Sequence, residues 1–170
     1  YRMQTYDGRN LQLEQIPYGG GQPAGYVTSP AEVVNYVENH DNQTLYDLNA
    51  FKLPLGTSSA DRARVQVLAA ALNAFSQGIT YWHAGFELLR SKSMDRNSYD
   101  SGDWFNRLDW TGRDNFFGTG LPPARDNAAS WPLMRPRLAD PRLRPSAADI
   151  EWARAAFVDL MRIRSSSTLF

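Results

Sequence analysis

Residues 33–42 have the sequence VVNYVENHDN, a short apolar run followed by polar residues. The run from Val33 to Val37 is rich in β-branched side chains, which is typical of a strand buried on both faces of a parallel sheet. His40 and Asp41 follow this run after two polar residues, Glu38 and Asn39. Ligands bind at the C-terminal ends of strands in open sheets and in barrels alike, so this pair is the first candidate for a functional site.

A helix and a second strand are predicted downstream. Ser58 or Ser59 is a suitable helix N-cap, and Gly78 stands where the helix C-terminus favours a left-handed residue. Apolar residues recur at spacings of three and four and predict one buried stripe: Val65, Leu68, Leu72 and Phe75. Residues 79–82 are the second strand candidate. The order strand, helix, strand predicts a parallel α/β fold.

The rest of the chain divides into three parts. Residues 1–31 are rich in Gly and Pro and predict a loop. Residues 85–145 are mostly irregular, yet their many aromatic side chains predict that they are packed and not disordered. Ser146 and Asp149 have the spacing of a capping box and predict the start of a last helix, whose apolar stripe includes Ile150.

The composition excludes several classes of protein. The 170 residues include 18 Lys and Arg against 18 Asp and Glu, so the chain lacks the basic excess that nucleic-acid binding normally needs. The absence of Cys excludes disulfides, thiolate zinc sites and a cysteine nucleophile. No apolar run approaches the roughly 20 residues of a membrane span, and no signal peptide opens the chain. The compartment is left open by the sequence.

The pair His40 and Asp41 has two alternative interpretations. In one, Asp41 caps the following turn and His40 bonds a backbone carbonyl group. In the other, both residues bind a metal ion together with His83, as in a metal-dependent phosphohydrolase. This second alternative is weak, because such sites need more His and carboxylate ligands than the chain offers.

Two polar segments lie further along the chain. Residues 95–103 are rich in oxygen ligands, but the EF-hand spacing fails, so Asp and Ser side chains that bond their own backbone are favoured over a calcium site. Residues 104–110 have the sequence WFNRLDW, in which aromatic rings alternate with Arg107 and Asp109. Flat rings flanked by hydrogen-bonding groups suit a sugar, although Arg107 and Asp109 are equally compatible with a surface ion pair.

Several of these segments, in the same order, resemble the α-amylase superfamily. The resemblance is strongest to its pullulanase and limit-dextrinase branch, the α-1,6-glucan debranching enzymes. It covers at least residues 21–170 and rests on segments 21–26, 33–45, 78–85, 89–96, 98–109, 120–123 and 163–170. The agreement of several motifs in one order is far more specific than the pair His40 and Asp41 alone.

The resemblance implies the fold class α/β, as a fragment of a (β/α)8 TIM barrel. Residues 33–38 would be strand seven, residues 79–82 strand eight and residues 148–164 helix eight, with a long loop after strand eight. Residues 1–170 would then be the C-terminal portion of a catalytic barrel, without strands one to six and without the C-terminal β-domain. Its partner would be the remainder of its own barrel, and the first residue, Tyr1 in place of Met, fits a piece of a longer protein.

The resemblance also implies roles for single residues. Asp41 would be the carboxylate that stabilises the oxocarbenium-like transition state. His40 would bond a sugar hydroxyl, Asn42 would line the opposite side of the cleavage point, and Arg107 and Asp109 would contact adjacent glucose units. The substrate would be an α-glucan such as pullulan, amylopectin or a limit dextrin. No cofactor is certain, and calcium in the full-length enzyme is left open.

Retaining glycoside hydrolysis needs a nucleophile and a general acid, both carboxylic acids. In the family these residues lie upstream, and residues 1–170 contain no motif that resembles either of them. We therefore expect the chain alone to be inactive, and a non-catalytic α-glucan-binding fragment is the alternative of a different class. Two strands with open edges would also favour oligomerisation, an unusual packing of the long loop, or poor stability of the chain.

Overall fold

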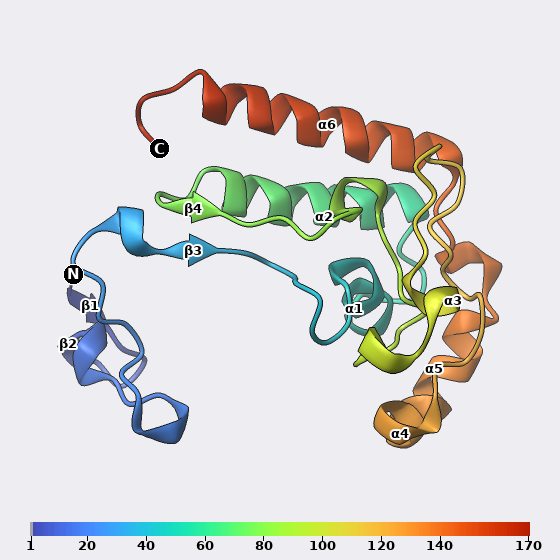
Figure 1. Cartoon of the computed structure of the whole chain (residues 1–170), viewed down its shortest axis with the longest axis horizontal. Coiled ribbons are helices and arrows are strands. Elements are labelled where there is room, and N and C mark those ends of the chain that lie inside the picture. The colour runs from blue at the N-terminus through green and yellow to red at the C-terminus, as the bar shows by residue number, and fades with distance from the viewer. Residues whose placement is uncertain (1) are drawn as a thin grey trace. The chain divides into compact units, whose positions relative to one another are not determined.

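The computed structural model of the chain describes residues 2–170 (Figure 1). The chain divides into two compact units, one of residues 1–34 with 77–79 and one of residues 35–76 with 80–170. Within residues 2–170 no helix is long and apolar enough to cross a membrane.

The first unit contains an antiparallel hairpin of β1 (Arg2–Gln4) and β2 (Asn10–Gln12), in which Met3 pairs with Leu11. Single 3-10 turns follow at Leu13–Gln15, Gly19–Gly21 and Pro30–Glu32. The prediction of a loop over residues 1–31 missed this hairpin. Its strands are three residues long with one apolar residue each, which is too short for an alternating pattern to reveal them.

The strands predicted on either side of the long helix form a second, parallel pair. β3 (Val34–Asn35) and β4 (Ile79–Thr80) are each two residues long. The amide of Ile79 donates to the carbonyl of Val33 and the amide of Tyr81 donates to that of Asn35, both at 2.8 Å. The residue numbers increase together along both strands, which is the pattern of a parallel pair. Val34 is 51% exposed and Ile79 is 56% exposed, so the expected burial on both faces is wrong.

The predicted fold class, a fragment of a (β/α)8 barrel, is also wrong. Over residues 2–170 the sheets are the two-stranded pairs β1–β2 and β3–β4, and neither pair curves into a closed wall. The β-branched run at residues 33–37 predicts that the chain is extended there. It does not determine how many neighbouring strands the extended segment has, and that number is what distinguishes a barrel from an isolated pair.

The α-helices belong to the second unit. They are α1 (Leu45–Lys52), α2 (Ser59–Ala74), α3 (Asp103–Asn106), α4 (Ala124–Asn127), α5 (Trp131–Leu138) and α6 (Ala147–Ser165). The predicted caps are confirmed for the two long helices, α2 and α6. Ser58 accepts from the amide of Asp61, and Ser146 and Asp149 form a reciprocal capping box. Figure 1 shows α2 and α6 running side by side.

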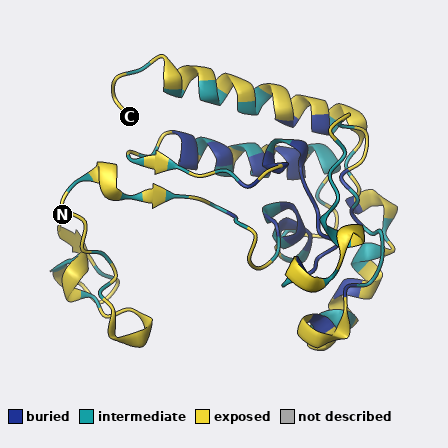
Figure 2. Ribbon diagram, viewed as in Figure 1, coloured by how far each residue is buried: buried dark blue, intermediate teal, exposed yellow. Residues whose placement is uncertain are grey.

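The stripe predicted to be the buried face of α2 is instead its exposed face. Leu68 and Leu72 are 61% and 66% exposed, while the buried residues of the helix are Arg62, Ala63, Gln66, Ala70, Asn73 and Ala74 (Figure 2). The small Ala side chains permit close packing of α6, whose buried residues include Ala153. The buried Arg62 guanidinium donates to the carbonyls of Asn49 and Pro54 at 2.9 and 2.8 Å, so backbone carbonyls and no carboxylate satisfy these donors.

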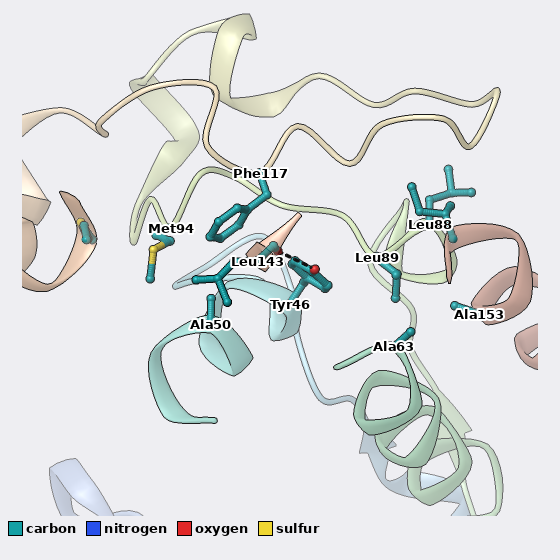
Figure 3. Packing of buried hydrophobic residues seen from close by; sticks show 11 residues of the cluster. Tyr46, Ala50, Ala63, Leu88, Leu89, Met94, Phe117, Leu143 and Ala153 are labelled. Carbon is teal, nitrogen blue, oxygen red and sulfur yellow. Dashed lines mark hydrogen bonds between the residues drawn. The ribbon is translucent and has the colours of Figure 1, made fainter. Parts of the chain in front are cut away.

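The irregular segment of residues 85–145 is packed, as predicted. Figure 3 shows Leu89, Met94 and Phe117 of this segment gathered around Tyr46 of α1, and Leu143 closes the same cluster. The segment also contains α5, which sequence reasoning missed. Pro132 and Pro136 suggest breaks in a helix, but Pro132 occupies the first turn, where its missing amide costs nothing.

Candidate functional site

Asp41, the predicted transition-state stabiliser, and His40, a predicted substrate contact, lie in an exposed turn between β3 and α1. The side chains of His40 and Asp41 are 77% and 63% exposed, and Nε2 of His40 lies 3.6 Å from Oδ1 of Asp41. Asn42 has a φ of 57°, a left-handed conformation that Asn tolerates better than most residues. The turn therefore presents an imidazole, a carboxylate and an amide to solvent in three consecutive residues.

The backbone of this turn is fixed by buried side chains. Glu38 is 6% exposed and its Oε2 accepts a 2.6 Å hydrogen bond from the amide of Leu45, so its side chain spans the turn. Lys92 is 1% exposed and donates from Nζ to the carbonyl of His40 at 3.1 Å. The hydroxyl of Thr44 caps α1 by accepting from the amide of Asp47. The exposed side chains of His40 and Asp41 therefore belong to a turn whose backbone is fixed by these hydrogen bonds.

Glu38 also belongs to a buried chain of three polar side chains. Its Oε1 lies 2.9 Å from Nδ1 of His83, and Nε2 of His83 lies 3.0 Å from Nη1 of Arg90. A guanidinium only donates hydrogen bonds, so Nε2 of His83 is the acceptor and Nδ1 carries the proton that is donated to Glu38. His83 is thus a neutral imidazole with a defined tautomer, placed between a carboxylate and a cation.

A second buried carboxylate supports the segment that follows Arg90. Asp47 is fully buried, its Oδ1 accepts from the Ser91 hydroxyl at 2.6 Å, and its Oδ2 accepts from the Lys92 amide at 2.8 Å. Removal from water raises the pKa of Asp47 to about 6, although these hydrogen bonds act in the opposite direction. Burial likewise lowers the pKa of the Lys92 ammonium. Sequence reasoning missed Glu38, Asp47 and Lys92 as members of the site.

The structure argues against the metal-site alternative. Both ring nitrogens of His83 are engaged by Glu38 and Arg90, and the ring is buried, whereas His40 is exposed. Within residues 2–170 no group of three or more His, Cys, Asp or Glu side chains is arranged to hold a metal ion. A metal-dependent phosphohydrolase built on His40, Asp41 and His83 is therefore not supported.

The polar loop after Met94 bonds its own neighbours. Oδ1 of Asp95 accepts from the amide of Asn97 and from the side-chain amide of Asn127, and its Oδ2 accepts from the hydroxyl of Ser101 at 2.6 Å. These bonds use both oxygens of the buried carboxylate for local structure. The loop fits the favoured alternative, in which Asp and Ser side chains organise the backbone.

Arg107 lies between two aromatic rings. Its guanidinium carbon is 4.0 Å from the ring centroid of Trp104 and 4.0 Å from that of Phe116. The indole nitrogen of Trp104 donates to the carbonyl of Thr119 at 3.2 Å, which orients the ring. Two ring faces thus hold the guanidinium flat, so this loop is a rigid aromatic and cationic surface.

Asp109 has a local role that the sequence does not reveal. Its carboxylate accepts hydrogen bonds from the amide and hydroxyl of Thr111 and from the amides of Arg113 and Asp114, at 2.6–3.1 Å. These bonds, led by the Thr111 hydroxyl, lower the pKa of Asp109 to about 2. Within the described part of the chain Asp109 makes no ion pair with Arg107, so the predicted surface pair is not formed.

The turn of residues 39–44 is linked through Arg90 to residues 104–110, which we call the aromatic loop. Besides His83, Arg90 donates from Nη1 to the carbonyl of Ala84 at 3.0 Å and from Nη2 to the carbonyl of Asn106 at 3.2 Å. Asn106 directly precedes Arg107. The chain Glu38, His83, Arg90 therefore connects the backbone below Asp41 to the backbone that carries Arg107.

Comparison with known proteins gives related sequences along the whole chain. Residues 112–170 match the family model described as "Alpha-1,6-glucosidases, pullulanase-type, C-terminal". The chain is 45% identical over all of its 170 residues to Pullulanase 1, chloroplastic, of Arabidopsis thaliana, and covers 18% of that protein. It is 40% identical to the pullulanase of Klebsiella pneumoniae over 96% of the chain and 15% of that protein.

Solved structures agree with this relationship. The crystal structure of Klebsiella pneumoniae pullulanase complexed with maltotriose matches 98% of the chain and 16% of the crystallised chain, with 38% identity and a TM-score of 0.85. The chain spans less than a fifth of the length of these relatives. The relatives are pullulanases, and the match of residues 112–170 to a C-terminal model corrects the assignment of this chain to a catalytic barrel.

Proposed function

We propose that this chain is part of a pullulanase-type α-1,6-glucosidase, which hydrolyses α-1,6-glucosidic bonds in branched α-glucans with retention of configuration. The observation that carries the proposal is the exposed Asp41 on an anchored turn, in a chain whose relatives along its whole length are pullulanases. Maltotriose, the ligand named for the solved relative, is a short α-glucan, which supports the same substrate class.

In this proposal Asp41 acts by its charge. Glycoside hydrolysis passes through an oxocarbenium-like transition state, and a fixed carboxylate beside the developing positive charge stabilises that state more than the ground state. The turn suits this role, because the Lys92 ammonium and the Glu38 carboxylate fix its backbone while the Asp41 side chain stays accessible. His40 and Asn42 would contribute hydrogen bonds to sugar hydroxyls on the two sides of Asp41.

Arg107 is the glucan contact that the aromatic loop supports best. Its stacked guanidinium presents N–H groups at a fixed edge, which suits a hydroxyl-rich rim of a sugar. Asp109 has its oxygens engaged by residues 111–114. We therefore propose that Asp109 contributes to glucan binding indirectly, by fixing the shape of this loop.

The isolated chain is expected to be inactive in this proposal, since it lacks a recognisable nucleophile and general acid. The test compares the purified 170-residue chain with the full-length protein that carries it, each incubated with pullulan while reducing ends are measured. Release by the full-length protein and none by the chain is the expected result. Hydrolysis by the chain above a blank would show that the required carboxylates lie within residues 1–170.

A second candidate function is glucan binding without turnover. The stack of Trp104, Arg107 and Phe116 favours it, because the complete stack lies within this chain. Affinity electrophoresis of the chain in gels that contain amylopectin tests it, with dextran gels as the control for a glucan of different linkage. Retardation in amylopectin alone, combined with no activity in either form of the protein, would favour this function over the glucosidase.

A further inference from the structure

We infer that Glu38, His83 and Arg90 form a positioning relay, which sets the place of Asp41 relative to the aromatic loop that carries Arg107. The inference rests on the proposed function, because it assigns these three buried residues a part in the same reaction. None of the three is exposed enough to touch a glucan directly: Glu38, His83 and Arg90 are 6%, 8% and 9% exposed.

The first step of the argument is that Glu38 connects two elements. One carboxylate oxygen accepts from the amide of Leu45, the first residue of α1, and the other accepts from Nδ1 of His83, just after β4. The turn that carries Asp41 begins beside Glu38 and ends beside Leu45. A shift of the Glu38 carboxylate therefore moves both ends of this turn.

The second step is that the relay has a direction. Arg90 can only donate and the Glu38 carboxylate can only accept, so the neutral His83 ring between them must accept at Nε2 and donate at Nδ1. Every contact in the relay then pairs one donor with one acceptor. If one acceptor in the relay is replaced by a donor, two N–H groups face each other. A buried mismatch of this kind breaks the hydrogen bond instead of weakening it slightly.

The third step is that the relay reaches the aromatic loop. Nη2 of Arg90 donates to the carbonyl of Asn106, the residue before Arg107. Leu108 of the same loop lies so close to Gly85 that a Cβ on Gly85 would come within 2.5 Å of the Leu108 side chain. The loop is therefore seated against residues 83–90, and displacement of Arg90 changes its position.

The test uses Glu38→Gln in the full-length protein. The side-chain oxygen of Gln can still accept from the Leu45 amide. Its NH₂ group, however, faces the N–H at Nδ1 of His83, so the shape of the side chain is kept while one hydrogen bond becomes a contact between two donors. We expect kcat for pullulan hydrolysis to fall on the order of 10²-fold, as for other small misplacements of catalytic groups, while KM changes far less. Glu151→Gln makes the same chemical change on the exposed face of α6 and is expected to leave both constants unchanged.

A second pair of variants separates positioning from folding. In His83→Gln the amide can still donate towards Glu38 and accept from Arg90, whereas His83→Leu can do neither. We expect kcat, normalised to folded protein by titration of active sites, to be clearly higher for His83→Gln than for His83→Leu. Equal kcat values for the two variants, or a Glu38→Gln variant that loses only thermal stability, would overturn the relay.

The same measurements distinguish the relay from the proposed function. An active wild type whose Glu38→Gln variant retains wild-type kcat overturns the relay and leaves the glucosidase standing. A wild-type protein that does not hydrolyse pullulan overturns the glucosidase, and the positioning role falls with it.

Discussion

The hydroxyl of Tyr46 donates a 2.8 Å hydrogen bond to the carbonyl of Leu143, although the two residues are 97 positions apart in the chain. Tyr46 is 1% exposed and Leu143 is fully buried, so water cannot replace this bond (Figure 3). The bond joins α1, which follows the turn of Asp41, to the 3-10 turn Pro141–Leu143 ahead of α6. One phenol thus connects the candidate site to the C-terminal part of the fold.

Tyr46→Phe removes only this hydroxyl and leaves the Leu143 carbonyl without its partner. We expect the free energy of unfolding to fall by about 1–3 kcal/mol, the cost of an unsatisfied buried acceptor. Urea unfolding of the two proteins measures the change. Tyr36→Phe, at a ring that is 54% exposed, is the matched control and is expected to have no measurable effect. Equal losses in both variants would mean that the Tyr46 bond adds nothing specific.

The buried Asp47 predicts a pH dependence of stability. Its pKa is raised from 3.8 to about 6 by removal from water, so the native state binds a proton more tightly than the unfolded state does. This contribution to stability is complete below about pH 4 and is lost as the pH rises through about 6. The full difference corresponds to about 3 kcal/mol.

The measurement is the difference in unfolding free energy between wild type and Asp47→Asn, taken from about pH 4 to pH 7. The variant cannot titrate at this position, so the difference isolates Asp47 from the other carboxylates. We expect wild type to lose stability relative to the variant over this range. Asp159→Asn removes an exposed carboxylate that pairs with Arg162, and it is the control for the change in net charge. A flat difference for Asp47→Asn would show that the buried carboxylate is ionised throughout.

The sequence predicts local features of this fold better than it predicts packing. The caps Ser58 and Ser146 are read correctly, because capping depends on residues three positions apart. The face of α2 is read incorrectly, because its apolar residues Leu68 and Leu72 are exposed while its Ala and polar side chains are buried. Periodicity identifies a stripe on a helix, but it does not identify which neighbour the helix will have.

The candidate site shows the same limit. The pair His40 and Asp41 stands out in the sequence, because it follows a strand candidate. The members that hold it do not stand out: Glu38 and His83 are 45 residues apart and meet only in the folded chain. The sequence offers one signal for these members, which is Glu38 at the end of an apolar strand candidate. A carboxylate at such a position needs a partner when it is buried.

Ser146→Ala tests the cap of α6 alone. The Ser hydroxyl accepts from the amide of Asp149 at 3.1 Å, and the Asp149 carboxylate accepts from the amide of Ser146 at 2.9 Å. We expect a loss of about 1 kcal/mol of unfolding free energy, measured by urea titration. Ser165→Ala, at the other end of the same helix, should leave stability unchanged or slightly raised. A comparable loss at both ends would contradict the capping interpretation.

Arg107→Lys tests whether the stacked guanidinium contributes to glucan binding. Lys keeps the charge, but it cannot lie flat between Trp104 and Phe116 or present a fixed edge of donors. We expect weaker binding of maltotriose by isothermal titration of the full-length protein, by at least several-fold. The control is Arg64→Lys, at a looser contact 5.9 Å from the ring of Trp152. Unchanged affinity in Arg107→Lys would place this stack outside the glucan site.

Asp41→Asn in the full-length protein tests the proposed transition-state role. The amide keeps the size of the carboxylate and the turn keeps its anchors at Glu38 and Lys92, so the folded state should be preserved. The loss of one fixed negative charge should lower kcat by about 10²–10³-fold, the scale of other electrostatic losses in enzymes. Asp103→Asn, an exposed carboxylate at the start of α3, is the control. A near-normal kcat in Asp41→Asn, with an unchanged Tm, would mean that Asp41 does not stabilise the transition state, since folding and catalysis would then both proceed without its charge.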